Sequence, residues 1–163
     1  MLVLGIDPGT QIVGWGAVAL GSGQQVSLVE YGCIRTRSGR PPEENLMVIH
    51  KELSGLISRL RPDEMSVESL YFTSNAKTAI GVGQARGVVL LTAAMRNLPV
   101  TSYGPLTVKE TVTGDGKAGK REVQKMVQMT LKLAHTPQPD DAADALAIAL
   151  THAFSYKLKR RIL

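Results

Sequence analysis

The first ten residues, M-L-V-L-G-I-D-P-G-T (Met1 to Thr10), decide the fold that the rest of the sequence predicts. Their apolar run is typical of a strand that is buried on both faces, and it ends abruptly at Asp7, Pro8 and Gly9. An unpaired carboxylate beside so apolar a segment costs several kcal/mol unless a cation, hydrogen-bond donors or water compensate it. Asp7 is therefore either a residue that caps the turn after a central strand or part of a functional site.

The composition is that of an ordinary globular protein. The chain has 163 residues, of which 44% are hydrophobic and 20% charged, so we expect one domain with a substantial core and no long disordered region. The single cysteine, Cys33, rules out an internal disulfide and favours a reducing cytoplasm. We expect no membrane span or membrane partner, because no apolar run approaches about 20 residues and no signal peptide is apparent. A net charge of +5 favours a polyanionic partner.

The apolar patterns after the first strand predict an α/β fold with a five-stranded mixed sheet flanked by helices. Short turns join the first three strands, which we expect to be antiparallel, whereas the last two strands each follow a helix and should be parallel to a neighbour. We expect one domain over residues 1–156 and a basic, flexible tail over residues 157–163. The predicted strands are residues 1–7, 12–20, 25–36, 65–70 and 99–103, and the predicted helices are residues 41–60, 76–97, 107–112, 120–133 and 140–154.

The segment D-D-A-A-D-A-L-A-I-A-L-T-H-A-F (Asp140 to Phe154) predicts a helix with almost no polar face, so we expect it to be largely buried. Asp140 follows Pro139 and suits the N-cap position, where the helix dipole favours an acid. Asp141 and Asp144 are three residues apart and share one face of the helix. An acid within so apolar a sequence is not a solvated surface residue, and this favours a functional site at Asp144.

The helix predicted over residues 76–97 is unusually rich in small residues. Gly81, Gly83, Ala85 and Gly87 lie within seven residues, and each interior glycine costs about 0.5 to 1 kcal/mol relative to alanine. The presence of several small residues despite this cost indicates that another backbone approaches the helix closely. The helix also has enough apolar surface for two partners. We therefore expect a homodimer through this helix, with a monomer and a tightly buried helix as the alternative.

Four carboxylates are expected to meet at one edge of the sheet. If the first and fourth strands are parallel neighbours, Asp7 and Glu68 both lie at carboxyl ends, and Asp141 and Asp144 join them if the first turn of the last helix packs there. Such a cluster repels itself unless divalent cations neutralise it, and oxygen ligands select Mg²⁺ or Mn²⁺. We expect a site for two ions about 3.5 to 4 Å apart, which would activate water on one side of a phosphodiester and stabilise the leaving 3′ oxygen on the other.

Several of these motifs together resemble the RuvC-type Holliday-junction resolvases. The resemblance implies a ribonuclease H-like fold, a homodimer, and paired nicking of four-way junction DNA that depends on Mg²⁺, with Mn²⁺ as a substitute. It also implies a role in DNA recombination and repair and a bacterial RuvA/RuvB branch-migration complex as a partner. The matching segments, from Met1 to about Phe154, are G-I-D-P-G-T, V-G-W-G, V-E-S-L-Y-F, G-Q-A-R-G and D-A-A-D-A-L-A-I-A-L-T-H.

The same resemblance assigns catalytic residues to this chain. The four catalytic acids of the family, which are also its metal ligands, match Asp7, Glu68, Asp141 and Asp144. The adjacent Asp140 is an extra acid that could replace Asp141 as a ligand. No Ser, His and Asp combination for a covalent nucleophile is apparent, so direct attack by water is the simplest mechanism.

DNA contacts are expected at one aromatic and four basic residues. The resemblance places the aromatic that inserts near the junction centre at Tyr71 and two DNA-contacting lysines at Lys109 and Lys120. The glycine-lysine loop and the helix after it add Lys117 and Arg121 to the expected DNA-binding residues. The alternative is an ordinary solvated side chain at each basic position and core packing at the aromatic one.

Two other functions remain open from the sequence. An actin-like nucleotide-binding protein would use D-P-G-T to hold phosphate, but such proteins have two related domains, for which this chain is too short. A non-catalytic module that binds structured nucleic acid would use the acids only as caps. A metal requirement for turnover would separate a nuclease from such a module, and thermal stabilisation by ATP would identify the actin-like protein.

Overall fold

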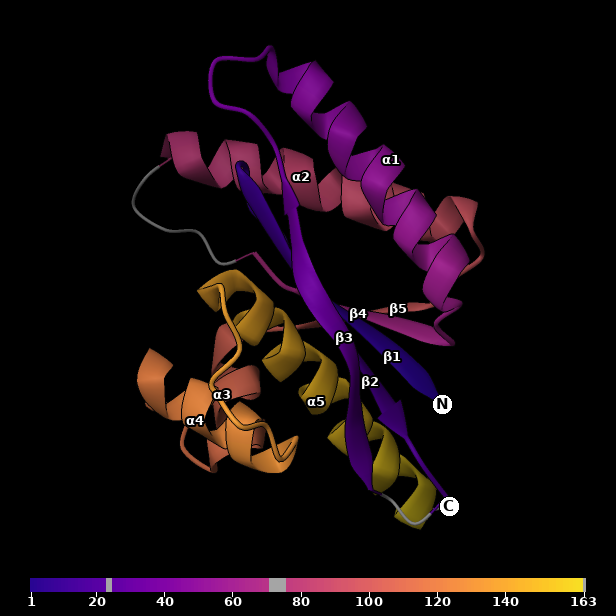
Figure 1. Cartoon of the computed structure of the whole chain (residues 1–163), viewed down its shortest axis with the longest axis vertical. Coiled ribbons are helices and arrows are strands. Elements are labelled where there is room, and N and C mark those ends of the chain that lie inside the picture. Colours follow the sequence, from indigo (N-terminus) through magenta and orange to yellow (C-terminus); the bar gives the residue numbers. More distant parts are fainter. Residues whose placement is uncertain (23–24, 71–75, 163) are drawn as a thin grey trace.

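The computed structural model describes residues 1–22, 25–70 and 76–162, and a five-stranded sheet forms its centre (Figure 1). The strands are β1 (Leu2–Asp7), β2 (Ile12–Leu20), β3 (Val26–Arg35), β4 (Glu64–Glu68) and β5 (Val100–Tyr103). They lie in the order β3-β2-β1-β4-β5. Since β1, β2 and β3 are antiparallel and β4 and β5 run parallel to β1, the mixed sheet predicted from the sequence is confirmed.

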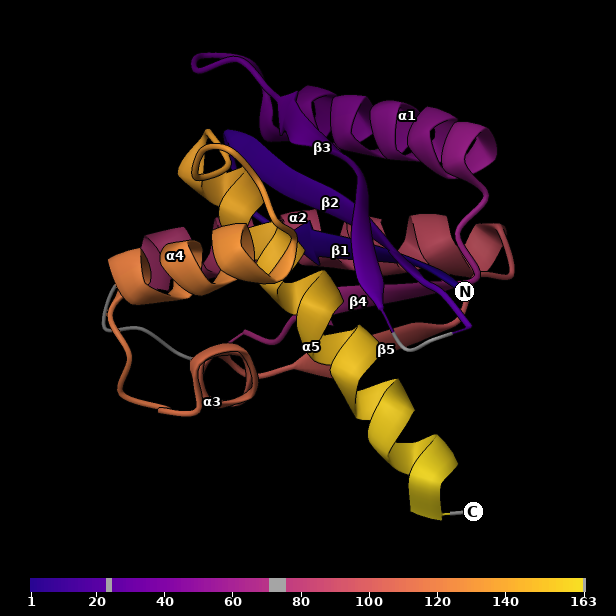
Figure 2. The same ribbon diagram turned by 60° about the horizontal axis from the view of Figure 1, so that its bottom comes forward.

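Within the described residues, five helices cover the two faces of this sheet. They are α1 (Pro42–Leu60), α2 (Ala76–Met95), α3 (Pro105–Thr113), α4 (Lys120–Thr130) and α5 (Asp140–Ile162). Helices α1 and α2 lie on one face, and α3, α4 and α5 lie on the other (Figures 1 and 2). Helix α4 is shorter than predicted because the chain turns at Lys132, where φ is 54°. Helix α5 is longer than predicted, so residues 157–162 are helical, and the flexibility expected of the tail stays a prediction.

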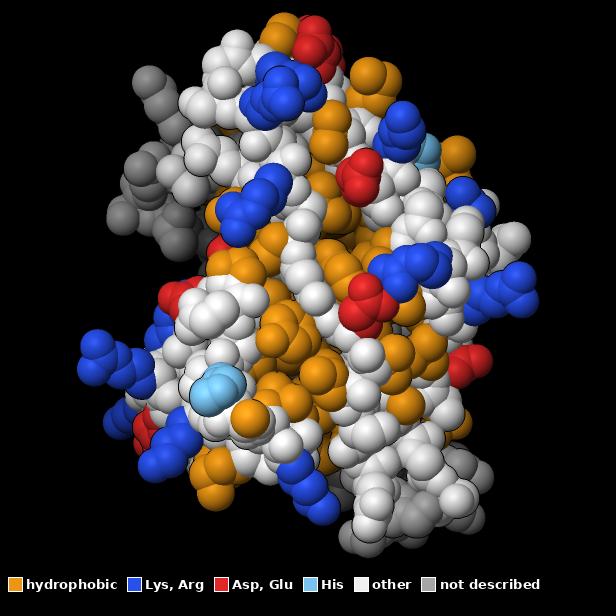
Figure 3. All heavy atoms as spheres, in the orientation of Figure 1, with side chains coloured by type: hydrophobic (Ala, Val, Ile, Leu, Met, Phe, Trp, Pro, Cys, Tyr) orange, Lys and Arg blue, Asp and Glu red, His pale blue; other side chains and the backbone are white. Residues whose placement is uncertain are grey.

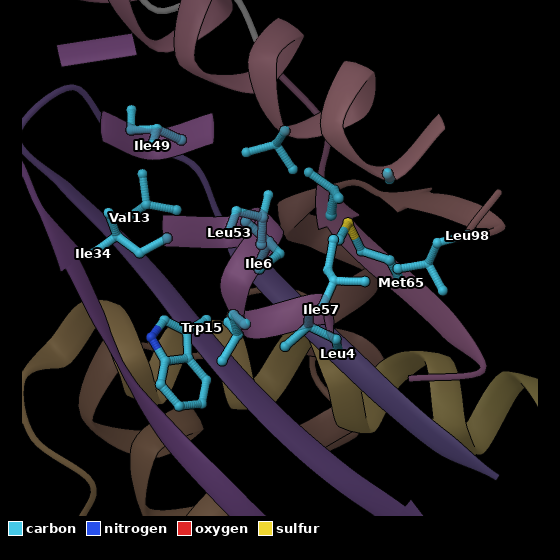
Figure 4. Close-up of a cluster of buried hydrophobic side chains, with 14 of the residues drawn as sticks. Leu4, Ile6, Val13, Trp15, Ile34, Ile49, Leu53, Ile57, Met65 and Leu98 are labelled. Carbon is cyan, nitrogen blue, oxygen red and sulfur yellow. The ribbon is translucent and has the colours of Figure 1, made fainter. Parts of the chain in front are cut away.

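One hydrophobic core lies between the sheet and the helices α1 and α2 (Figure 4). In β1, Leu4 and Ile6 point into this core, because alternate residues of a strand face the same side of the sheet. Burying a leucine or isoleucine side chain in this way stabilises the fold by about 1.5 to 3 kcal/mol. The α1 residues in this core are those of the predicted apolar stripe: Ile49, Leu53, Leu56 and Ile57.

The second core is built around α5, in which every residue from Ala145 to Ala153 is buried, as the sequence predicted. A polar network near the C-terminal end of this stretch ties the helix to two strands. The ring of His152 lies with Nε2 2.8 Å from Glu64 Oε2 and Nδ1 2.9 Å from the Tyr103 hydroxyl oxygen. Burying the two ring nitrogens of His152 without hydrogen-bond partners would cost free energy. The network therefore favours one position of α5 relative to β4 and β5.

Three glycines allow α5 to lie very close to β1 and β2. A Cβ atom at Gly5 would overlap the carbonyl oxygen of Ala145, and a Cβ atom at Gly14 would overlap the carbonyl oxygen of Asp141. Gly16 faces α5 in the same way. Only glycine permits this approach of two backbones, and as a result the first turn of α5 lies against the end of β1.

Helix α2 has one side in the core and one side exposed. Ala85, Val89 and Ala93 are buried, whereas Ile80 and Leu91 on the other side are 64% and 58% exposed. By length and composition, residues 78–95 could cross a membrane, which corrects the expectation that no segment approaches that length. This is weak evidence for a membrane span, because the helix packs on a sheet and core helices pass the same test.

Candidate active site

Asp7 and Glu68 lie side by side at one edge of the sheet because the strands that they end are parallel neighbours. Ile6 pairs with Val67 in the register, and Asp7 and Glu68 occupy the next position along β1 and β4. Both side chains are half-buried. The structure therefore brings these two acids together, as the strand pattern predicted.

The first turns of α5 add Asp141 and Asp144 to this edge. Burial, followed by the charges of Glu68, Asp144 and Asp141, raises the pKa of Asp7 from 3.8 to about 8. At neutral pH the carboxyl group of Asp7 therefore carries a proton for most of the time in the metal-free protein. A cation among the acids would release this proton, because it favours the charged form.

The pKa values of Glu68 and Asp144 are raised as well. Burial, followed by the charge of Asp144, raises the pKa of Glu68. Burial also raises the pKa of Asp144, with Lys120 opposing this effect and Asp140 adding to it. A group of acids whose pKa values are raised by burial and by one another is typical of a functional site.

Lys120, the first residue of α4, makes ion pairs with two of the acids. Its Nζ atom lies 3.1 Å from Asp144 Oδ2 and 3.4 Å from Asp140 Oδ2. Partial burial disfavours the ammonium group, but the hydrogen bonds and charges of these two carboxylates outweigh it and raise the pKa of Lys120. Gln124 also donates a hydrogen bond of 3.0 Å to Asp140 Oδ1. Asp140 was expected at the N-cap of this helix, but it is the first residue of α5 instead, and its side chain contacts α4.

A cleft of about 200 Å³ opens beside the acids. Glu68 and Asp144 line it together with Lys109 from α3 and Lys120 from α4, so two of the predicted DNA-binding lysines lie at the acids. This arrangement suits an anionic group that must approach carboxylates, since the lysines offset the repulsion. The apolar remainder of the lining consists of Pro105, Val108, Val123, Ala147 and Ile148.

The other predicted DNA contacts lie farther out or outside the described residues. Lys117 and Arg121 are exposed and do not line the cleft, although Figure 3 shows Lys and Arg side chains gathered over α4, at the lower left. Tyr71 falls outside the described residues, so its role in stacking stays a prediction. Within the part of the chain that is described, no three His, Cys, Asp or Glu side chains already stand as a metal-binding group.

Arg86 is a site residue to which the sequence analysis gave no role. From α2, its Nε atom donates a hydrogen bond of 3.1 Å to the main-chain carbonyl of Glu68, and an Nη atom donates one of 2.8 Å to the Ser102 hydroxyl. Arg86 thereby ties the ends of β4 and β5 to α2 on the face opposite α5. The signal in the sequence was a lone arginine within the apolar segment G-Q-A-R-G, but no pattern predicts a bond to a main-chain oxygen.

Comparisons with known proteins identify the family of this chain. The family model described as crossover junction endodeoxyribonuclease RuvC matches residues 3–152. The RuvC of Moorella thermoacetica is 55% identical over 153 residues, 94% of this chain and 91% of that protein. The RuvC of Pelotomaculum thermopropionicum is 50% identical over 162 residues, 99% of this chain and 98% of that protein.

Among solved structures, Thermus thermophilus RuvC in complex with a Holliday junction substrate superimposes with a TM-score of 0.92. It is 39% identical in sequence, and the match covers 98% of this chain and 96% of that one. The ribonuclease H-like fold expected from the sequence is confirmed by this match together with the observed sheet order. The chain therefore belongs to the RuvC family of crossover junction endodeoxyribonucleases.

Proposed function

We propose that this protein resolves four-way DNA junctions by hydrolysing phosphodiester bonds at the acidic cleft, with Asp7, Glu68, Asp141 and Asp144 as its metal ligands. The observation that carries the proposal is the meeting of acids from β1, β4 and α5 in a protein with a net charge of +5. Family membership and the junction bound to the Thermus relative support it. Neither the actin-like nor the non-catalytic alternative is favoured by the comparisons.

The donor set fits Mg²⁺ or Mn²⁺. All four side chains offer hard oxygen donors, and Asp7 has a pKa of about 8 because of burial and its acidic neighbours, so bound cations would relieve that repulsion. The charges of Glu68, Asp144 and Asp141 all act on the pKa of Asp7, although no three of the described His, Cys, Asp or Glu side chains already stand as a metal-binding group. When bound, two divalent ions supply a more acidic water and charge stabilisation at the leaving oxygen.

The chain's own residues would bind and orient the substrate around this chemistry. Glu68 is held by the main-chain bond from Arg86, which limits its movement when charge develops nearby. Lys109 and Lys120 lie in the cleft and would hold phosphate oxygens of the cleaved strand. The apolar lining displaces water from one side of the cleft, and this strengthens each of these electrostatic contacts.

A homodimer through α2 completes the proposal, because a junction has two strands to cut. The exposed stripe of α2 consists of Ile80, Gln84, Gly87, Leu91 and Met95. A Cβ atom at Gly87 would meet no atom within 4 Å, so this glycine leaves open space for a second helix. Gly81, in contrast, packs against Thr10 of its own chain, so only part of the glycine cluster is available to a partner. A twofold contact through the α2 stripe would hold two active sites in fixed relation.

The remaining partners follow from family membership alone. We propose a RuvA/RuvB branch-migration complex as a partner and the bacterial cytoplasm as the location. Co-purification of the chain with each of these two proteins, with and without junction DNA, would test the partnership.

The test of the proposed function is cleavage of a synthetic four-way junction compared with a linear duplex, in Mg²⁺ and in EDTA. The wild type should cut only the junction and only with the metal ion. Asp7→Asn, Glu68→Gln and Asp144→Asn should abolish cutting but retain junction binding, since phosphate contacts remain. Asp141→Asn should be severe, and Asp140→Asn should be mild if Asp140 is no ligand. Cutting by Asp7→Asn near the wild-type rate would refute the metal assignment.

A further inference from the structure

The loop between β3 and α1, residues 36–41, lies at the same sheet edge as the acids, at the top of Figure 1. Arg35, the last residue of β3, pairs with Ile12, the first residue of β2, directly after the turn that follows Asp7. The main-chain N–H of Thr36 donates to the Gln11 carbonyl, and the Thr36 hydroxyl donates to the Thr10 carbonyl, both at 2.9 Å. The loop is therefore fixed to the turn that begins at the end of β1.

Three arginines, one at the end of β3 and two in the loop, give this segment a positive charge that forms no ion pair within the described residues. Arg35, Arg37 and Arg40 take part in no ion pair among the described residues. Glu43 and Glu44, in the first turn of α1, leave the segment with a net charge of +1. Figure 3 shows Lys and Arg side chains over this end of the molecule, separate from those over α4.

The loop is ordered by contacts that leave the arginine side chains free to bind. Asn45 Oδ1 accepts a hydrogen bond from the main-chain N–H of Arg37 at 3.2 Å, and Asn45 Nδ2 donates one to the Arg37 carbonyl at 3.0 Å. This clamp uses only main-chain atoms of Arg37. The guanidinium group is thus presented from a fixed backbone, which lowers the entropy cost of binding an anion.

A hollow of about 270 Å³ lies beside the loop, on the face of the sheet that α1 and α2 cover. Arg37 and Arg40 line it together with Thr10 and Gln11. All four side chains can donate hydrogen bonds, so this part of the lining suits the oxygens of a phosphate group. The cleft at the acids opens on the other face of the sheet, where α3, α4 and α5 lie.

Lys and Arg side chains thus lie on both sides of the acidic cluster, which by itself repels DNA. Lysines from α3 and α4 lie on one side, and the β3–α1 loop, which is tied to the turn after Asp7, lies on the other side. We propose that Arg35, Arg37 and Arg40 form a second phosphate-binding surface, which holds a duplex arm of the junction beside the acidic cleft. This inference rests on the proposed function, since the anion is the backbone of the same DNA.

The experiment measures junction affinity in EDTA over a series of salt concentrations. Arg37→Gln and Arg40→Gln are made singly and together, and Arg61→Asn is the matched control. Arg61 is the C-cap of α1, about 28 Å from the start of the helix, and asparagine tolerates the φ of 51° at this position. The Arg61→Asn variant therefore removes one exposed charge at the end of the helix far from the loop. Circular dichroism confirms that each variant is folded.

The double variant should reduce the slope of log affinity against log salt by about two units, each single variant by about one, and the control by none. An unchanged slope in the double variant would overturn the inference and would leave the arginines to a partner other than DNA. That failure is distinct from failure of the proposed function, because the wild type in Mg²⁺ would still cut the junction. An equally large reduction of the salt slope in Arg61→Asn would also overturn the inference, since the effect would then reflect the net charge of the protein alone.

Discussion

Replacing Asp7 by asparagine should make the metal-free protein more stable while it removes a proposed metal ligand. Burial and neighbouring carboxylates raise the pKa of Asp7 from 3.8 to about 8 in the folded chain. Between these pH values the folded chain binds a proton that the unfolded chain has lost, so the free energy of unfolding falls as pH rises from about 4 to about 8. Asparagine takes up no proton, so the variant escapes this loss of stability.

The size of the effect follows from the shift in pKa. A pH of 7 lies about three units above the ordinary pKa of 3.8, and each unit corresponds to about 1.4 kcal/mol. The stability that the wild type loses through Asp7 at pH 7 is therefore at most about 4 kcal/mol. The Asp144 side chain is 33% exposed and paired with Lys120, so solvent and counter-charge reduce the repulsion. We expect a gain of about 1 to 3 kcal/mol at pH 7, or roughly 3 to 10 °C in Tm, and little gain at pH 4.5.

Thermal unfolding followed by circular dichroism at pH 4.5, 6 and 8 in EDTA would measure this gain. Glu52→Gln, at an exposed position in α1, is the control for removing a carboxylate without relieving the cluster. Mg²⁺ should then stabilise the wild type, by about 2.7 kcal/mol at 100 times its dissociation constant, and stabilise Asp7→Asn much less. An Asp7→Asn protein that unfolds no later than the wild type at pH 8 in EDTA would refute the reasoning, as would equal stabilisation by Mg²⁺.

Four further outcomes are expected. Gly14→Ala should cut the cleavage rate at least tenfold, because its Cβ atom would push the first turn of α5 away, whereas Gly55→Ala, with open space around it, should leave the rate unchanged. Gly87→Leu should weaken the dimer in analytical ultracentrifugation and give single nicks in place of paired ones, without lowering Tm by more than a few degrees. Arg86→Lys should lower the cleavage rate and raise the Mg²⁺ concentration for half-maximal rate, with junction affinity unchanged, since lysine cannot make both hydrogen bonds. Tyr71→Ala should reduce cleavage with little change in Tm, and an equal loss of stability would show that the ring belongs to the core.

The sequence was sufficient for the number of strands and for which of them are antiparallel and which parallel, whereas the neighbouring positions of β1 and β4, which bring Asp7 beside Glu68, were only a condition of the prediction. The strand directions depend on local rules: a short turn makes strands antiparallel, and a helix between strands makes them parallel. The end of α4 was missed by three residues, since a left-handed residue at Lys132 stops the helix and no glycine or proline marks the place. The extension of α5 was missed because its last turns are rich in Lys and Arg, which indicated a frayed basic tail.

The fine geometry of the site could not be predicted, because it depends on how elements that are distant in the chain are packed. Lys120 was expected near DNA, and its pairing with Asp140 and Asp144 depends on the relative position of α4 and α5. The bond from Arg86 to the Glu68 carbonyl has no counterpart in any sequence pattern, since every residue offers the same acceptor.

The positions of the four acids are set by contacts in which their charges take no part. Pairing of β1 with β4 places Asp7 beside Glu68, and the close approach of α5 at Gly14 places Asp141 and Asp144 there. These contacts do not involve the carboxylate groups, so the fold holds the acids near one another against their repulsion. Divalent ions bound among them would relieve the repulsion that helps to raise the pKa of Asp7. In the proposed function, a basic protein would thus keep an acidic centre ready for cations while its lysines and arginines attract DNA to the same edge.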